Sequence, residues 1–218
     1  MPKNAPHLVF ISHSHKDKEL ATQIKDELES RLSLQAFVAH EDIRPTQEWQ
    51  ETILEKLREC DVFLALLTKH FQKSNWTNQE TGIAFSLHKI IIPIKIEVNP
   101  YGFISRLQAL RWNRDNAEEG IDKMITLFYE REFISTAALI EGLGKSTSFA
   151  DAGLKSELLQ KIRRLSAKQV NQIAIAAVQN NQVYDSYKAK RVLRKLFTKY
   201  SDIIDPKVLK KVREHYVI

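Results

Sequence analysis

Short apolar runs alternate with amphipathic stretches along the first 135 residues. Five apolar runs, the last of them weak, have the length and composition of buried strands, and they cover residues 7–12, 35–39, 61–68, 90–96 and 110–112. The stretches between and after them repeat apolar residues at helical spacing. Three of them cover residues 16–32, 77–87 and 117–132, and a fourth has Trp49, Ile53 and Leu57 on one face. Strands that alternate with single helices predict an α/β fold with a parallel sheet.

Residues 136–218 show only helical periodicity, over 154–165, 166–180, 186–200 and 206–216. The charge changes at the same place: residues 1–135 carry 17 Lys and Arg against 20 Asp and Glu, and residues 136–218 carry 16 against 7. Together with the small-residue stretch 142–153, this shift predicts two domains, 1–135 and a small basic helical domain at 136–218. The basic cluster 188–195 favours a solvated helix face over a nucleic-acid surface, because no recognition motif accompanies it.

Composition narrows the class of protein. No apolar run approaches the roughly 18 residues of a membrane span, and the N-terminus has no signal-peptide pattern. Cys60 is the single cysteine, so the chain has no internal disulfide and no cysteine-based zinc cluster. We therefore expect a cytoplasmic protein without membrane partners.

Several motifs are considered and set aside. Residues 142–147 look like a phosphate loop, but Leu139 stands where that motif needs a glycine, and no strand precedes it. The chain has no dinucleotide fingerprint of spaced glycines and lacks the acidic cluster of a phosphoacceptor domain. His13 and His15 have no third ligand partner, which predicts solvent-facing loop histidines and no metal site.

The segments that follow the predicted strands hold the candidate chemistry, because parallel sheets bind ligands beyond the carboxyl ends of their strands. These segments are Ser12–Ser14, the polar loop 40–46, Thr68–Glu80 and the turn after Ile96. Three sequence blocks stand out there. They are VFISHSHKD at 9–17, AHEDIRP at 39–45 with Trp49, and NWTNQE at 75–80. The segments NPYGF at 99–103 and LQAL at 107–110 follow in order.

Together these blocks resemble the Toll/interleukin-receptor (TIR) domain, particularly its prokaryotic branch, over about residues 7–132. The resemblance implies a flavodoxin-like five-stranded parallel sheet. It also implies cleavage of NAD+ at the nicotinamide–ribose bond, with Glu80 as the catalytic carboxylate and Trp76 four residues before it. NAD+ would be the substrate, and no separate cofactor is expected. We expect Ser12, His13, Asp42, Thr68 and Trp76 to contact this substrate.

A structural interpretation competes with the catalytic one. Thr77 and Glu80 have the spacing of a capping box, in which Thr77 would be the N-cap and Glu80 the third helical residue. Trp76 could be a packing residue, and loop 40–46 could be an ordinary solvated connection. In that case the protein would be a non-enzymatic TIR scaffold or interaction module.

By resemblance, the setting is antiviral defence against phage, and the products are nicotinamide with ADP-ribose or a cyclic ADP-ribose isomer. Such a cyclic product would be a nucleotide signal for a separate effector protein. Loop 40–46 matches the loop through which the family self-associates, so we expect an oligomer. The C-terminal domain is expected to serve dimerisation or regulation.

Overall fold

The computed structural model describes residues 7–32, 34–39 and 49–218, which form two compact units. Among the described residues, the sheet unit comprises residues 7–29, 34–39 and 49–124, and the helical unit comprises residues 30–32 and 125–218. Two helices belong to both units: the last turn of α1 (Lys18–Leu32) and the second half of α5 (Ala117–Glu130) are parts of the helical unit. The division inside α5 lies earlier than the charge shift near residue 135.

Five parallel strands make the sheet, and each buries apolar side chains as its sequence predicts. They are β1 (Leu8–Ser12), β2 (Gln35–Val38), β3 (Val62–Leu67), β4 (Ile90–Lys95) and β5 (Leu110–Arg111). The strand order is β2-β1-β3-β4-β5, with Ile11 opposite both Val38 and Leu64. This order confirms the flavodoxin-like prediction and places β1 and β3 side by side at the centre.

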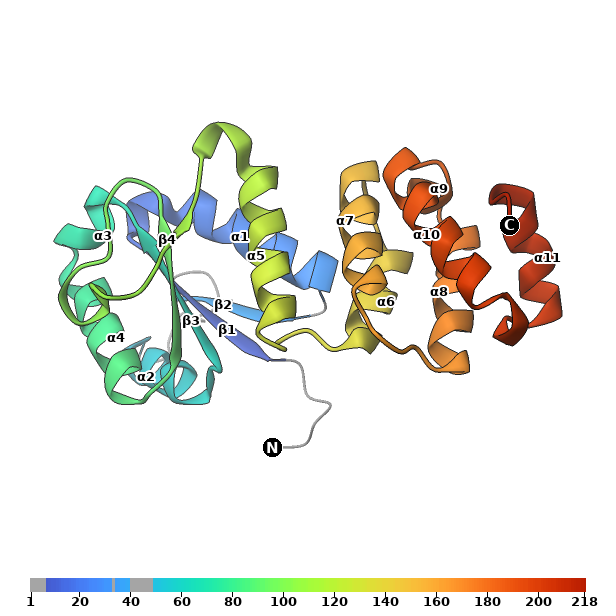
Figure 1. The fold of residues 1–218 in the computed structure, drawn as a ribbon. Coiled ribbons are helices and arrows are strands. Elements are labelled where there is room, and N and C mark those ends of the chain that lie inside the picture. Colours follow the sequence, from blue (N-terminus) through green and yellow to red (C-terminus); the bar gives the residue numbers. More distant parts are fainter. Residues whose placement is uncertain (1–6, 33, 40–48) are drawn as a thin grey trace. The chain divides into compact units, whose positions relative to one another are not determined.

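Helices cover both faces of this sheet (Figure 1). On one face lie α2 (Trp49–Glu59), α3 (Lys69–Lys73) and α4 (Asn75–Ser86), and α1 with the first part of α5 lies on the other. The core between β1, β3 and the first group of helices is aromatic. Phe10 stacks on Phe63 with ring centroids 5.6 Å apart, and Phe71 of α3 is fully buried beside them.

Six further helices join the parts of α1 and α5 in the second unit, which confirms the prediction that the C-terminal region is helical. They are α6 (Thr136–Gly144), α7 (Phe149–Gln160), α8 (Ala167–Gln179), α9 (Asn181–Tyr184), α10 (Tyr187–Lys199) and α11 (Pro206–His215). Serine hydroxyls cap four of them at the N-terminus, and Ser166 with Gln169 forms a capping box on α8. The buried core includes Leu139, Leu158, Ile173, Leu193, Phe197 and Tyr216.

The small-residue stretch 142–153, expected to mark a domain boundary, lies within the helices α6 and α7 and the turn between them. Close packing explains its small residues. A Cβ at Gly142 would lie 2.7 Å from the backbone oxygen of Arg31, and a Cβ at Gly153 would lie 2.8 Å from the side chain of Lys188. Glycine is therefore needed there for close approach rather than for a flexible link.

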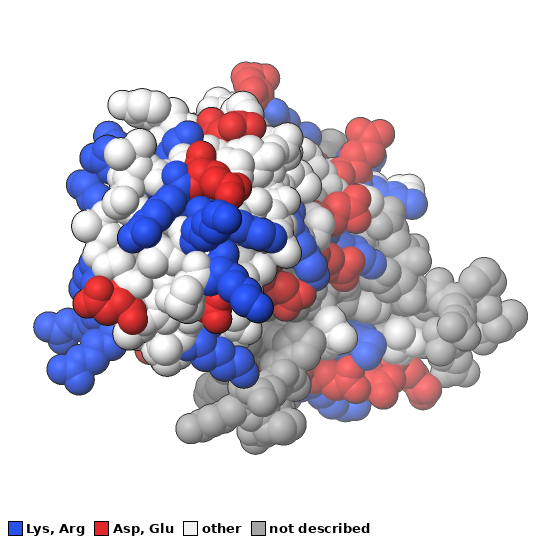
Figure 2. Space-filling model, turned by 90° about the vertical axis from the view of Figure 1, so that its right-hand side faces the viewer, with Lys and Arg blue, Asp and Glu red and all other residues white. Residues whose placement is uncertain are grey.

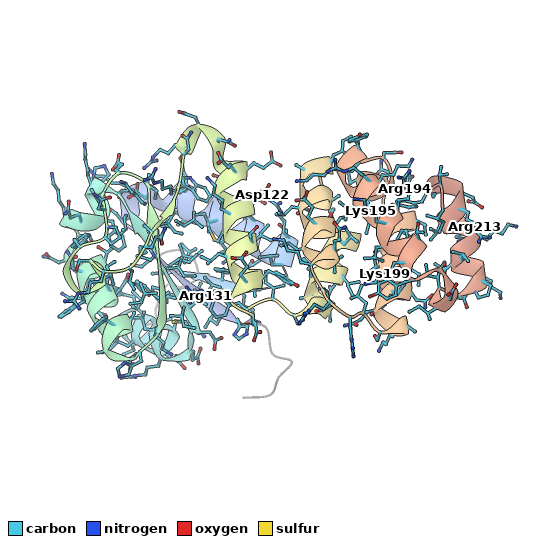
Figure 3. The ribbon with its side chains drawn as sticks, in the orientation of Figure 1. Asp122, Arg131, Arg194, Lys195, Lys199 and Arg213 are labelled. Atoms are coloured by element: carbon cyan, nitrogen blue, oxygen red, sulfur yellow. The ribbon has the colours of Figure 1, made fainter. Side chains whose placement is uncertain are left out.

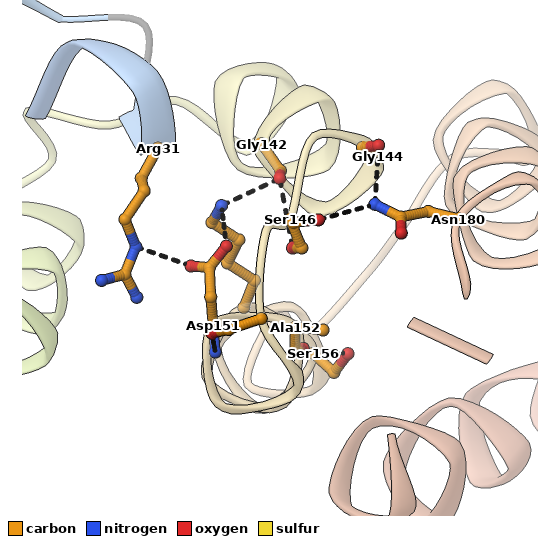
Figure 4. A network of polar contacts seen from close by, with 10 residues as sticks. Arg31, Gly142, Gly144, Ser146, Asp151, Ala152, Ser156 and Asn180 are labelled. Atoms are coloured by element: carbon orange, nitrogen blue, oxygen red, sulfur yellow. Dashed lines mark hydrogen bonds and ion pairs between the residues drawn. The ribbon is translucent and has the colours of Figure 1, made fainter. Parts of the chain in front are cut away.

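A buried ionic network holds these helices together (Figure 4). Asp151 accepts a hydrogen bond from Arg31 Nε at 2.8 Å and another from Lys155 Nζ at 2.8 Å. Lys155 Nζ also donates to the Gly142 carbonyl at 2.8 Å. All three charged side chains are at least nine-tenths buried, so the last turn of α1 is bonded into the helical unit through Arg31.

None of the described helices is long and apolar enough to cross a membrane.

Candidate active site at the carboxyl edge of the sheet

The carboxyl ends of β1 and β3 bring two predicted site residues to one edge of the sheet. Ser12 is the last residue of β1, and Thr68 follows β3 directly. Both are fully buried. Because β1 and β3 are hydrogen-bonded neighbours, their adjacency follows from the strand order alone.

Glu80 enters this edge from α4, and its carboxylate accepts a hydrogen bond from the Ser12 hydroxyl. Glu80 is 5% exposed, and this burial raises the pKa of its carboxyl group to about 7. The hydrogen bond from Ser12 acts in the opposite direction and lowers this pKa. Among the described residues no cation contributes to this balance. A buried carboxylate that retains its proton to near neutrality is a common feature of catalytic sites.

The start of α4 shows that Glu80 is not part of a helix cap. The N-cap is Ser74, whose hydroxyl accepts a hydrogen bond from the Thr77 amide, and Glu80 lies in the second turn. The predicted capping box with Thr77 at the N-cap is therefore wrong. The Thr77 hydroxyl instead donates to the carbonyl oxygens of Phe71 at 2.6 Å and Ser74 at 3.1 Å, which joins α3 to α4.

A second polar cluster lies at the same edge around Asp17. This side chain, in the 3-10 turn after β1, is almost fully buried and accepts a hydrogen bond from Thr68 Oγ1 at 2.6 Å. The Thr68 hydroxyl in turn accepts a bond from the Phe71 amide at 3.0 Å. Arg114, in the turn after β5, contacts the other Asp17 oxygen at 3.2 Å and keeps a half-exposed side chain.

Thr68 is thus committed to structural bonds through both its donor and its acceptor capacity. Arg114 is a functional candidate that the sequence analysis missed. Its signal was available, because Arg114 follows the last strand of a parallel sheet and therefore lies at the edge that binds ligands.

The remaining predicted residues differ in exposure. His13, expected to face solvent, is 4% exposed, with Nδ1 3.4 Å from the Ile11 carbonyl oxygen, while His15 is exposed as predicted. His13 is buried because it directly follows β1, a central strand of the sheet. Trp76 is 41% exposed and packs edge-on against Trp49, with ring centroids 4.2 Å apart. Its exposed part could still stack on a planar ring.

Asp42 and the whole of loop 40–46 lie outside the described residues, so their predicted roles stay predictions. Within the described part of the chain, no group of three or more His, Cys, Asp or Glu side chains could hold a metal ion.

The chain shows three similarities to known proteins. A probable 2′ cyclic ADP-D-ribose synthase, BdTIR, from Brachypodium distachyon is 29% identical over 94 residues, which is 42% of each chain. The chain thus spans about two fifths of the length of this curated relative. The TIR domain of the Toll-related receptor TRR-2 from Hydra magnipapillata is 20% identical, with a TM-score of 0.47 over 57% of this chain and 96% of that one. A family model described as TIR domain matches residues 9–125, more than half of the chain, and the protein therefore belongs to the TIR domain family.

Proposed function

We propose that this protein cleaves NAD+ at the bond between nicotinamide and ribose, with Glu80 as the catalytic residue. The observation that carries the proposal is the Glu80 carboxyl group itself. It is buried at the carboxyl edge of the sheet, has a raised pKa and takes no part in the helix cap. Membership of the TIR family and the name of the plant relative, a probable 2′ cyclic ADP-D-ribose synthase, support the choice of substrate.

The chemistry needs only one fixed negative charge. Nicotinamide leaves as a neutral pyridine, so no acid has to protonate it, and positive charge develops on the ribose. A carboxylate held beside that ribose stabilises the oxocarbenium-like transition state electrostatically. Because the ionised form of Glu80 does this work, activity should rise with pH through the pKa of about 7.

The other site residues then have distinct roles. Ser12 fixes one oxygen of the Glu80 carboxylate and so orients it. Trp76, with its exposed ring edge, is proposed to stack on a heteroaromatic ring of NAD+, and His13 and Asp42 to contact the ribose. Thr68 supports the edge by holding Asp17, and through it Arg114. Arg114 is half-exposed and cationic, which suits the NAD+ diphosphate.

The products would be nicotinamide with ADP-ribose or a cyclic ADP-ribose isomer, released in antiviral defence and, when cyclic, read by a separate effector. Self-association through loop 40–46, with the helical unit contributing, would complete the site. In that case specific activity would increase with protein concentration. Chromatography of the products separates hydrolysis from cyclisation.

The decisive experiment compares Glu80→Gln with the parent protein. The amide preserves the size of the side chain and its contact with Ser12 but removes the charge. We expect turnover of NAD+, followed by nicotinamide release, to fall at least about 100-fold, as when one electrostatic partner of a transition state is removed. Far-UV circular dichroism should be unchanged.

Glu97→Gln is the matched control. Glu97 follows β4 at the same edge of the sheet but is exposed, and it accepts a hydrogen bond from the Lys69 amide. Its variant should retain activity within about threefold of the parent, because Glu97 is not the carboxylate proposed to stabilise the ribosyl cation. Undiminished turnover by Glu80→Gln, or no turnover by the parent at any protein concentration, would contradict the proposed enzymatic function. The function as a non-enzymatic TIR scaffold would then replace it.

A further inference from the structure

The outer face of α10 is a row of positive charge. Six of its thirteen residues are Lys or Arg, and none is Asp or Glu. Its apolar residues Ala189, Val192, Leu193, Leu196 and Phe197 are all buried in the helical unit. The cations occupy the exposed positions of the helix and are Lys188, Lys190, Arg191, Arg194, Lys195 and Lys199. Figure 3 labels three of them, Arg194, Lys195 and Lys199.

Four of these cations have no carboxylate partner among the described residues: Lys190, Arg191, Arg194 and Lys195. Lys188 forms an ion pair with Glu157 at 3.0 Å, and Lys199 lies 4.8 Å from the ring centroid of Tyr200. Three acidic side chains of the unit are engaged elsewhere. Asp151 is buried in the ionic network, Glu141 pairs with Lys145, and Asp205 caps α11. The positive face of α10 is therefore not neutralised within the unit.

The surface near α10 differs from this row. Figure 2 shows Lys and Arg side chains over the end of the helical unit, with Asp and Glu side chains among them. On α11, for example, Lys207, Lys210, Lys211 and Arg213 share the helix with Glu214 and the N-cap Asp205. On α10, by contrast, six cations share the helix with no acidic residue, and the structure adds to the sequence pattern that these cations are exposed.

We propose that the outer face of α10 binds the phosphate backbone of double-stranded nucleic acid. A helix of this length spans about 20 Å, which matches roughly six base pairs of duplex. Its four unpaired cations stand in two pairs about one turn apart, so that several can reach phosphates at once. Cations dominate the face, so the contact positions the protein on the duplex without reading its sequence.

An anionic membrane surface fits α10 less well. Basic helices that bind membranes insert an apolar face beside the lipid headgroups. Here that apolar face is used in the core of the helical unit. Tyr187, 83% exposed, is the one large apolar side chain that α10 presents to solvent. Every exposed cation of α10 can still contact a phosphodiester group electrostatically, and this is the interaction that we propose for α10.

The test measures binding of the full-length protein to labelled DNA and RNA duplexes of roughly 20 base pairs, by fluorescence anisotropy. Four phosphate contacts predict an affinity that falls about 100-fold between 50 and 200 mM salt. The variant carrying Arg191→Glu, Arg194→Glu and Lys195→Glu should bind at least about 100-fold more weakly at 50 mM salt. All three side chains are exposed, and circular dichroism and the melting temperature establish that the variant is folded.

The matched control carries Lys207→Glu, Lys210→Glu and Lys211→Glu on α11. It changes the net charge by the same amount on another exposed helix. Its affinity for the duplexes should fall less than about fivefold, because long-range charge effects are screened by salt. Equal weakening by both triple variants would overturn the proposal, since binding would then follow net charge alone. Absence of duplex binding at 50 mM salt, or tighter binding to phosphatidylserine vesicles than to either duplex, would also overturn it.

Discussion

Each of the two units buries a carboxylate, and the surroundings of the two groups are opposite. Asp151 of the helical unit lies between two cations, Arg31 Nε and Lys155 Nζ, each 2.8 Å away. Glu80 of the sheet unit has a neutral hydroxyl, that of Ser12, as its partner. Burial raises the pKa of Glu80 to about 7 because no described cation offsets the loss of water.

This difference separates a structural carboxylate from the carboxylate that we propose to be catalytic. Two cations and a carbonyl oxygen satisfy the charges around Asp151, so this network fixes the packing of α6 and α7 and of the last turn of α1. No cation among the described residues neutralises the Glu80 carboxylate. Such a group is costly to the folded protein unless a positive charge develops next to it, and the proposed reaction would supply that charge as a ribosyl cation.

The largest expected effect comes from breaking the network of the helical unit. Asp151→Asn keeps the shape of the side chain but leaves two buried cations without their anion. We expect the free energy of unfolding, from urea denaturation followed by circular dichroism, to fall by about 3–5 kcal/mol. In the double variant Asp151→Asn, Lys155→Met, part of this loss should be recovered because one buried cation is removed.

Glu141→Gln provides the comparison on the surface. Glu141 and Lys145 have the same spacing of four residues as Asp151 and Lys155 and lie 2.5 Å apart, but both side chains are more than half exposed. Solvent screens this pair, so its loss should cost less than about 0.5 kcal/mol. Similar costs for Asp151→Asn and Glu141→Gln would show that burial of the network has no energetic weight.

The fold of the sheet unit could be predicted from the sequence because each strand and most helices show their own periodicity. The start of α4 could not. Ser74 and Thr77 are both able to cap a helix, and the choice depends on the bond from Thr77 Oγ1 to the Phe71 carbonyl. That carbonyl belongs to α3, a helix of five residues, which is too short to show a periodic pattern.

The polar network of the helical unit was equally beyond prediction. Arg31 and Asp151 are 120 residues apart, and nothing local marks them as partners. The carboxyl edge of the sheet was easier, because strand order alone brings Ser12 and Thr68 together. Sequence reasoning therefore located the candidate site but could not assign the bonds within it, such as the one that Thr68 donates to Asp17.

The pH dependence of stability gives the next largest effect. The folded protein holds the Glu80 proton more tightly than the unfolded chain, because its pKa is raised from 4.5 to about 7. The resulting stabilisation is fully present below pH 4.5 and is lost as pH rises through about 7, a change of about 3 kcal/mol. Glu80→Gln has no such proton to lose.

At pH 8, Glu80→Gln should therefore unfold at higher urea than the parent, and near pH 4 the two proteins should be alike. NAD+ turnover by the parent should change in the other direction and rise across the same pH range, because the ionised carboxylate is the active form. If the stabilities of parent and variant run parallel from pH 4 to pH 8, the pKa of Glu80 is not raised.

The smallest expected effect concerns Arg114 and depends on the proposed function. Arg114→Ala removes the half-exposed guanidinium that Asp17 holds at 3.2 Å. Loss of one exposed contact with a phosphate should raise KM for NAD+ about tenfold and leave kcat within about threefold. Nicotinamide riboside lacks the diphosphate, so kcat/KM for this substrate should be the same in variant and parent.

Arg106→Ala, which changes an exposed arginine before β5, should alter neither substrate's kinetics. An equal loss with NAD+ and nicotinamide riboside would mean that Arg114 acts by supporting Asp17 and the edge of the sheet rather than by binding phosphate.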